Sequence, residues 1–175
     1  MCGITGIHSL KQNINVSLFY VAHSLLRHRG PDDEGFALVN NDHDPVLLRG
    51  DDSIRDIENL DHIKTFHTAT TVLGHRRLSI IDLSSGGHQP YTYGNLVMVY
   101  NGEIYNYPEL KSELELLGHY FTTDSDTEVV LKAYSQWNTD CFNRFNGMWS
   151  LAIYNSLDKS IVLSRDRFGQ KPLFF

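Results

Sequence analysis

Short apolar runs separated by turn-forming residues most constrain how this chain can fold. Many of the runs are β-branched or aromatic, and Gly, Asn, Asp and Pro punctuate them. Runs of this length joined by hairpins are typical of antiparallel sheets that helices cover. The sequence therefore predicts a mixed, α+β chain. The expected strands are residues 3–7, 34–40, 45–48, 70–81 with a break at 74–77, 96–100, 147–154, 160–164 and 172–175.

Two segments predict helices from the spacing of their apolar residues. Residues 16–28 repeat apolar side chains at helical spacing, and the turn-forming sequence 29–33 ends them. A second helix is expected from Asn106, which can act as an N-cap, to Gly118. The predicted apolar stripes are Leu18, Val21, Ala22, Leu25 and Leu26 on the first helix, and Leu110, Leu114 and Leu117 on the second.

A capping box predicts a third helix. The sequence Ser125-Asp126-Thr127-Glu128 has the spacing of this motif, and the helix should run to about Trp137. Residues 51–66 are polar and irregular instead, so we expect them to be exposed and mobile. Residues 86–87 are expected to form a surface loop. We expect residues 1–175 to form one domain, because a chain of this length can bury a sizeable core.

Composition disfavours several classes of function. The hydrophobic content is 41% and the charged content 21%, as in ordinary globular proteins. The net charge of −6, without a block of like charge, argues against a nucleic-acid partner. No apolar stretch reaches the length of a membrane span, and the start lacks the pattern of a signal peptide. We therefore expect a cytoplasmic protein that binds no membrane.

The cysteines and histidines do not predict a metal site. Cys2 and Cys141 are not part of a Cys-x-x-Cys pair, and a reducing compartment fits them better than a disulfide between them. The nine histidines show no metal-ligand spacing, so we expect His75 and His88 to be structural.

Cys2 stands directly behind the initiator methionine. Removal of that methionine would place a thiol and a free α-amine on one residue. An α-amine titrates near pKa ~7.7–8.0, against ~10.4 for lysine, so it can act as a general base near neutral pH. Cys2 is therefore a candidate nucleophile with its own base. The alternative is a small apolar residue without a catalytic role.

Three further segments each have a functional and a structural interpretation. Arg76 and Arg77 could present a guanidinium to a carboxylate, or could form surface contacts and an ion pair. Asn101-Gly102 could form an oxyanion hole, or a tight hairpin turn. Asp126 could hold a substrate ammonium, or complement the dipole of a helix that it begins. None of the three segments decides between its two interpretations alone.

Taken together, the motifs resemble a known family. The sequence resembles the glutaminase domain of the class II glutamine amidotransferases, which are N-terminal-nucleophile hydrolases. The motifs occur in the same order along the chain as in that family. The sequence is most similar to the asparagine synthetase branch. The matching segments are Met1-Cys2-Gly3-Ile4, Arg27-His28-Arg29-Gly30-Pro31-Asp32, Gly74-His75-Arg76-Arg77-Leu78-Ser79-Ile80-Ile81-Asp82, Tyr100-Asn101-Gly102-Glu103-Ile104-Tyr105-Asn106, Ser125-Asp126-Thr127-Glu128 and Ser164-Arg165-Asp166-Arg167-Phe168-Gly169.

The resemblance implies a role for each candidate residue. Cys2 would attack the side-chain amide of L-glutamine and form a thioester, whose hydrolysis gives glutamate after ammonia has left. Asn101 and Gly102 would form the oxyanion hole. The α-carboxylate and the α-ammonium of glutamine would be bound by Arg77 with the backbone of Leu78, Ser79, Ile80 and Ile81, and by Asp126 with Glu103, respectively.

The resemblance also implies a fold and partners. The family fold is a four-layer αββα sandwich of two antiparallel sheets covered by helices. No cofactor or metal is expected in this domain. ATP and Mg²⁺ would belong to a synthetase domain or subunit, which is absent from this chain and would take up the ammonia. A homodimer is compatible with this interpretation. The rival interpretations are another amide hydrolase of the same fold, and a non-catalytic docking module if Met1 is retained.

Overall fold

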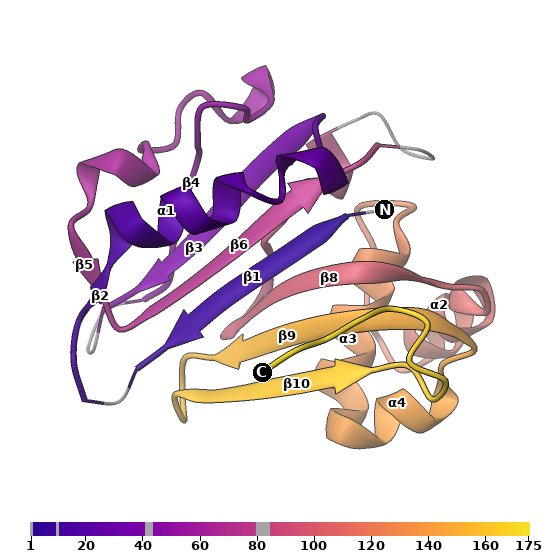
Figure 1. The fold of residues 1–175 in the computed structure, drawn as a ribbon. Helices are drawn as coiled ribbons and strands as arrows, with labels where there is room; N and C mark the ends of the chain where they lie inside the picture. The colour runs from indigo at the N-terminus through magenta and orange to yellow at the C-terminus, as the bar shows by residue number, and fades with distance from the viewer. Residues whose placement is uncertain (1, 10, 41–43, 80–84) are drawn as a thin grey trace. The chain divides into compact units, whose positions relative to one another are not determined.

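The computed structural model describes residues 2–9, 11–40, 44–79 and 85–175. The chain divides into two compact units, Met1–Pro90 and Tyr91–Phe175. Each unit has its own antiparallel sheet and its own hydrophobic core (Figure 1). The α+β class and the two antiparallel sheets are thus confirmed. No helix of the described residues is long and apolar enough to cross a membrane.

The first unit contains a four-stranded sheet in the order β1-β6-β3-β4. All of its neighbouring strands are antiparallel. Phe36, Leu38, Leu48 and Val72 contribute to the core on this sheet. The strands are β1 (Gly3–His8), β3 (Asp33–Val39), β4 (Val46–Leu48) and β6 (Thr71–Arg77), and β2 (Ile14–Asn15) pairs separately with β5 (Thr68–Ala69).

Helix α1 (Val16–Ser24) covers one face of this sheet (Figure 1). It buries Val16, Phe19 and His23, and the ring of Phe19 packs edge-on against Phe36. The predicted stripe is therefore wrong: Leu18, Val21 and Leu25 are exposed. The three buried residues are also at helical spacing. A hydrophobicity pattern does not reveal this face, because one of the three residues is a histidine. The helix ends at Ser24, and the 3₁₀ turn η1 (Arg27–Arg29) follows.

Strand β6 runs without the break that we expected at residues 74–77. Gly74 interrupts the pattern for a packing reason. A Cβ there would lie 2.8 Å from Thr5 Oγ1 and 2.8 Å from His23 Nδ1, so the strand needs glycine where α1 approaches it. Thr5 Oγ1 and His23 Nδ1 are themselves hydrogen-bonded at 2.7 Å, which gives Nδ1 of the buried imidazole a partner.

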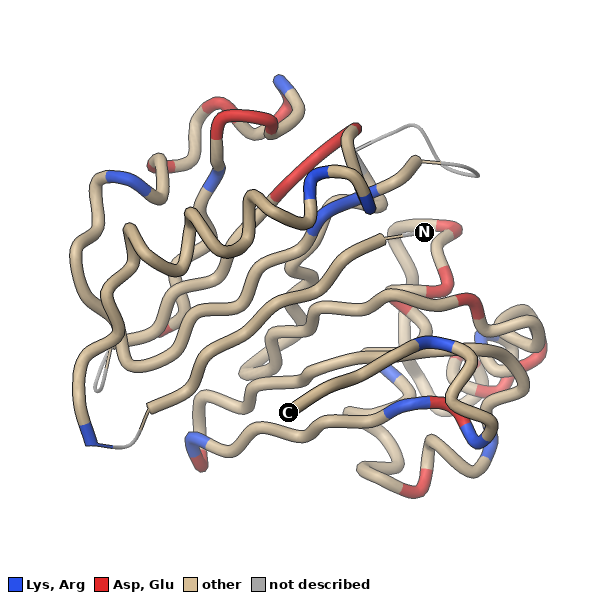
Figure 2. Tube along the Cα trace, viewed as in Figure 1, with Lys and Arg blue, Asp and Glu red and all other residues tan. Residues whose placement is uncertain are grey.

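The segment 51–66 is more ordered than its composition predicts. It contains the 3₁₀ turns η2 (Arg55–Ile57) and η3 (Ile63–Thr65), and Ile63 is fully buried. The expected general exposure is thus wrong for Ile63, while mobility stays a prediction. Figure 2 shows Lys and Arg interspersed with Asp and Glu along the traces of both units, without a long basic run.

The second unit contains a four-stranded sheet in the order β10-β9-β8-β7, with all pairs antiparallel. The hairpin of β9 and β10 lies where the sequence predicted it. Strand β8 continues through Asn101-Gly102, so the tight-turn interpretation of these residues is wrong. The strands are β7 (Tyr91–Tyr93), β8 (Leu96–Ile104), β9 (Gly147–Asn155) and β10 (Ser160–Arg165).

Helices cover one face of this second sheet. Helix α3 (Asp126–Trp137) has Ser125 as its N-cap, and the hydroxyl of Ser125 accepts a hydrogen bond from the Thr127 N–H. Helix α2 (Tyr107–Leu116) packs beside α3, and α4 (Cys141–Arg144) follows the 3₁₀ turn η5 (Asn138–Asp140) (Figure 1). Leu110, Leu114, Val130, Leu131 and Trp149 are among the buried core residues.

Three local expectations in this unit are corrected. Asn106 precedes α2 but does not cap it, because its side chain bonds to Arg144 and Asn146 instead. Leu117 is half exposed rather than part of the apolar stripe. Residues 172–175 form no strand, because none of the strands in the described chain pairs with them.

Candidate functional site

Cys2 and Arg77 lie at the same end of the first sheet. Gly3 pairs with Arg76 in the register of β1 and β6. Cys2 directly precedes β1, and Arg77 is the last residue of β6. Figure 1 shows the start of β1 beside the end of β6. Cys2 is partly exposed, whereas Arg77 is 6% exposed. Strand pairing therefore brings the backbones of Cys2 and Arg77 to the same edge of the sheet.

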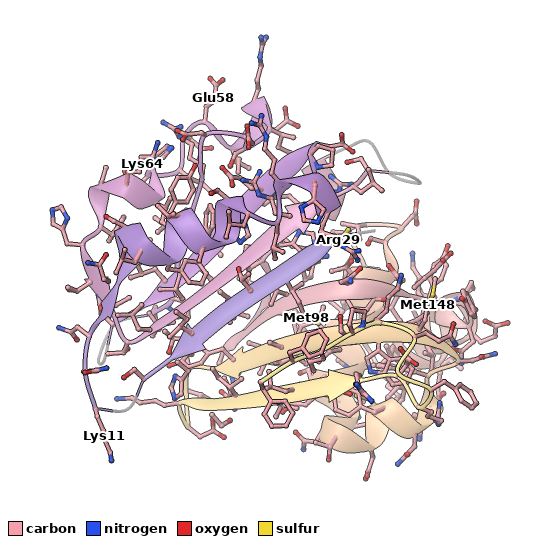
Figure 3. All side chains as sticks on the ribbon, in the orientation of Figure 1. Lys11, Arg29, Glu58, Lys64, Met98 and Met148 are labelled. Atoms are coloured by element: carbon pink, nitrogen blue, oxygen red, sulfur yellow. The ribbon has the colours of Figure 1, made fainter. Side chains whose placement is uncertain are left out.

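The turn after η1 supports this end of the sheet. A Cβ on Gly30 would lie 2.5 Å from the backbone nitrogen of Arg77, so the turn packs directly on the β6 backbone. The N–H of Asp32 donates to the carbonyl of Arg77 at 3.1 Å, and the Asp32 carboxylate accepts from the N–H of Ser79 at 2.8 Å. Arg29 lies beside the start of β1 (Figure 3). The motif at residues 29–32 thus supports Arg77 and Ser79.

Arg76 is the structural member of the arginine pair. Its guanidinium is 1% exposed and forms ion pairs with Glu34 at 2.8 Å and with Asp52 at 2.7 Å. Asp52 also pairs with Arg27 at 2.8 Å. Burial, together with the charge of Arg76, lowers the pKa of His23 to about 3, so this histidine is neutral. The ion-pair interpretation therefore holds for Arg76.

Asn101 and Gly102 lie side by side on β8, opposite Ser150 and Trp149 of β9. The hydroxyl of Ser150 donates to the Asn101 carbonyl at 3.5 Å, and Asn101 is 5% exposed. A Cβ on Gly102 would lie 2.5 Å from the Met148 carbonyl oxygen and 2.8 Å from the Trp149 Cα. Only glycine fits at residue 102, and the paired strands hold both backbones in a fixed position.

Asp126 joins the first turn of α3 to β8. Its Oδ2 accepts hydrogen bonds from the Tyr100 hydroxyl at 2.8 Å and from the Ile104 N–H at 3.0 Å. Burial raises the pKa of Asp126, and the nearby carboxylate of Glu103 raises it further. Two neighbouring carboxylates are a favourable place for a cation, because both attract it. Asp126 thus does more than complement the helix dipole.

The structure places the predicted site residues in two groups. In the first unit, Arg77, Leu78 and Ser79 lie at the end of β6 or directly beyond it, and Cys2 directly precedes β1, which pairs with β6. Asn101, Gly102, Glu103 and Asp126 lie together in the second unit. Ile80 and Ile81 lie outside the described residues. Among the described residues, no cluster of His, Cys, Asp or Glu could hold a metal ion.

Asp166 is a supporting residue to which the sequence assigned no role. It is 3% exposed and accepts backbone N–H bonds from Trp149 at 3.2 Å and from Phe168, Gln170 and Lys171 at 2.9–3.1 Å. Burial alone would raise the pKa of Asp166, but these hydrogen bonds hold it below its usual value. An aspartate between two arginines, two residues after the end of the predicted strand 160–164, was the available signal.

Comparisons with known proteins show the family of this chain. Residues 39–175 match the family described as glutamine amidotransferase domain. The chain is 35% identical, over its whole length, to a putative glutamine-hydrolysing asparagine synthetase 2 of Methanocaldococcus jannaschii and to asparagine synthetase 1 of Bacillus subtilis. It spans 32% and 24% of these two relatives, respectively.

Solved structures show the same fold. The glutamine phosphoribosylpyrophosphate amidotransferase of B. subtilis matches with a TM-score of 0.72 at 19% identity, over 93% of this chain and 37% of its own. A structure described as the allosteric regulatory enzyme of purine biosynthesis also matches with a TM-score of 0.72, at 21% identity, over 97% of this chain and 38% of its own.

Proposed function

Because this chain belongs to the glutamine amidotransferase family and is homologous to the glutaminase portion of asparagine synthetases, we propose that it hydrolyses L-glutamine to glutamate and ammonia. The observation that supports the proposal is the register of β1 and β6, in which Gly3 pairs with Arg76, because Cys2 directly precedes Gly3 and Arg77 directly follows Arg76. A nucleophile beside a guanidinium suits a substrate with a carboxylate and a reactive amide.

Cys2 performs the chemistry in this proposal. After removal of Met1, the α-amine of Cys2 takes the proton of the thiol, directly or through a water molecule. The thiolate attacks the amide carbon of glutamine, the carbon–nitrogen bond breaks, and the nitrogen leaves as ammonia with the transferred proton. Water then hydrolyses the γ-glutamyl thioester, which releases glutamate and regenerates the thiol.

Asn101 and Gly102 stabilise the oxyanion that forms during both steps. The side-chain amide of Asn101 and the backbone N–H of Gly102 are the donors in this proposal. Support comes from the rigidity of β8, where cross-strand pairing and the tight space around Gly102 fix both residues.

The two charged ends of glutamine are bound by opposite charges. Arg77 binds the α-carboxylate, with backbone groups of residues 78–81, and Asp126 and Glu103 bind the α-ammonium. The raised pKa of Asp126 supports this assignment, since a bound cation between the two carboxylates would relieve their repulsion. A residue pair of opposite charge distinguishes a free amino acid from a peptide.

The ammonia is consumed by a synthetase domain or subunit that uses ATP and Mg²⁺. This part of the proposal rests on the relatives, whose printed names describe asparagine synthetases and of which the chain spans a third or less. The glutaminase domain itself needs no cofactor. Cytoplasmic location and a homodimer complete the proposal.

Replacing Cys2 tests the proposal directly. Cys2→Ala and Cys2→Ser should abolish glutamate release, measured with a coupled glutamate dehydrogenase assay, without lowering the melting temperature. Cys141→Ala is the matched control, because burial raises the pKa of the Cys141 thiol to about 12 and leaves no thiolate near neutral pH. Near-normal glutamate release by Cys2→Ala would refute the assignment of Cys2 as the nucleophile.

A further inference from the structure

Gly87 lies directly against the guanidinium of Arg77. A Cβ built on Gly87 would lie 2.7 Å from Arg77 Cζ and would overlap Nη2. The φ angle of Gly87 is outside the left-handed region, so its backbone conformation does not require glycine. The space taken by the Arg77 side chain is therefore the physical reason for a glycine at this position. Residues 86–87 are thus more than the surface loop that the sequence predicted.

The residues after Gly87 are fixed to strand β3. His88 Nδ1 lies 2.7 Å from Asp33 Oδ2, and Asp33 is 1% exposed. The other oxygen of Asp33 accepts a hydrogen bond from the Ile54 N–H at 3.1 Å. The carboxylate is therefore held from two sides, and it can hold His88 in turn.

A second contact with β3 brings the same segment close to the sheet. A Cβ on Gly35 would lie 2.5 Å from His88 Cε1 and would overlap the carbonyl oxygen of Gln89. Asp33 and Gly35 are two residues apart on β3 and so lie on the same face of the strand. One face of β3 thus fixes residues 88–89 by the His88–Asp33 hydrogen bond and by a close backbone approach.

We propose that residues 87–89, the Gly87–Gln89 strap, position the Arg77 guanidinium for the α-carboxylate of glutamine. Gly87 limits where the guanidinium can lie, and the His88–Asp33 pair holds the strap in place. An arginine side chain has many rotamers, so confining it before the substrate arrives lowers the entropy lost on binding. A carboxylate is bound bidentately only when the guanidinium plane is correctly oriented.

This inference rests on the proposed function of Arg77 and makes Gly87 and His88 positioning residues. It predicts that Gly87→Ala displaces the guanidinium and raises the KM for L-glutamine about tenfold, with kcat changed less than about twofold. The inhibition constant of 4-aminobutanamide, which is glutamine without its α-carboxylate, should stay the same. A merely structural role of Gly87 would change both ligands alike.

A double-mutant cycle with Arg77→Ala sharpens the test. Once the guanidinium is gone, Gly87→Ala should cause no further rise in the KM for glutamine. His88→Ala should raise this KM severalfold, and His88→Asn should restore it, because the Asn amide can donate to Asp33 from the place of Nδ1. His67→Ala, an exposed histidine of the same unit, is the matched control and should be silent.

The outcomes separate the strap from the glutaminase proposal. If Gly87→Ala weakens 4-aminobutanamide as much as glutamine, or adds its full effect to Arg77→Ala, the strap inference is overturned although the glutaminase assignment stands. If the wild-type protein releases no glutamate, the proposed function fails first. Should Gly87→Ala fail to fold, judged by circular dichroism, the His88→Ala and His88→Asn pair decides: no rise in KM, or no rescue, overturns the strap.

Discussion

The hydroxyl of Tyr100 donates a 2.8 Å hydrogen bond to the carboxylate of Asp126, which fixes the first turn of α3 to the strand that carries Asn101. This bond favours the charged form of Asp126, while burial and Glu103 disfavour it. The protonation state of Asp126 therefore depends on Tyr100. A protonated Asp126 cannot hold an ammonium group by charge.

Tyr100→Phe should weaken glutamine binding most at acidic pH. The pKa of Asp126 is already raised, and loss of the Tyr100 donor raises it more. The carboxylate therefore becomes protonated at a pH that lies further above the usual aspartate pKa of about 3.9. We expect the KM for glutamine to rise as the pH falls, with the rise starting at higher pH in Tyr100→Phe than in the wild type. Steady-state kinetics across the acidic range measure this, and Tyr105→Phe, an exposed tyrosine, is the control. Identical pH profiles would argue against Asp126 as the ammonium ligand.

Asp126 and Glu128, both in the first turn of α3, should affect stability in opposite ways. The folded-state pKa of Asp126 is raised, so its stabilising effect is present at low pH and is lost as the pH rises through that pKa. Asp126→Asn should therefore leave the free energy of unfolding at pH 7 unchanged or higher, while glutamine binding is lost.

Glu128→Gln should be destabilising at neutral pH by roughly 3 kcal/mol, because it breaks a buried ion pair with Lys132. Burial opposes ionisation of Glu128, but Lys132 and the backbone of Thr123 lower its pKa to about 2. The stabilisation is present above the unfolded-state pKa of about 4.3 and is lost as the pH falls towards about 2. Urea unfolding at pH 7 and at low pH tests both variants, and equal destabilisation by the two substitutions would contradict this division.

Asn101→Ala and Arg77→Ala should separate turnover from binding. The oxyanion exists only along the reaction path, so Asn101→Ala should lower kcat about 10²–10³-fold with a small change in KM. Arg77→Ala should mainly weaken glutamine, by about tenfold to a hundredfold, because a charged hydrogen-bonding pair is lost. A higher KM alone in Asn101→Ala, with an unchanged KM in Arg77→Ala, would show that the roles are assigned wrongly.

An N-terminal extension should block turnover but not binding. A retained Met1 or a tag converts the α-amine of Cys2 into an amide, which cannot accept the thiol proton near pH 7. We expect glutamate release to disappear in such a protein, while glutamine still raises its melting temperature. Intact mass spectrometry confirms the extension before the assay. Turnover by a protein shown to be extended would exclude the α-amine as the base.

Motifs with fixed neighbours could be predicted from the sequence better than the packing around them. The order of site residues, the start of α3 at Ser125 and the hairpin of β9 and β10 all follow from local patterns. The buried face of α1 does not, because His23 is buried through a hydrogen bond to Thr5 that no periodicity reveals. Asn101-Gly102 has local turn propensity, yet pairing with β9 along nine residues overrides it.

The residues that support the candidate site could not be predicted from the sequence for a related reason. Asp32 and Asp166 act through backbone N–H groups brought to them by the fold, so neither needs a charged partner visible in the sequence. The contact of Gly87 with Arg77 likewise joins residues ten positions apart through a segment whose path the sequence does not specify. Such contacts depend on where the turns lead the chain, which short motifs do not encode.

Because Gly3 is paired with Arg76, Cys2 lies one residue from the edge of the sheet. One residue inserted between Cys2 and Gly3 would shift the thiol by about 3.3 Å along the strand direction and turn it to the opposite face. The position of the Cys2 sulfur thus depends on the number of residues between Cys2 and the paired strand. Shortening or lengthening the chain there would displace the thiol from its position although every other side chain stayed the same.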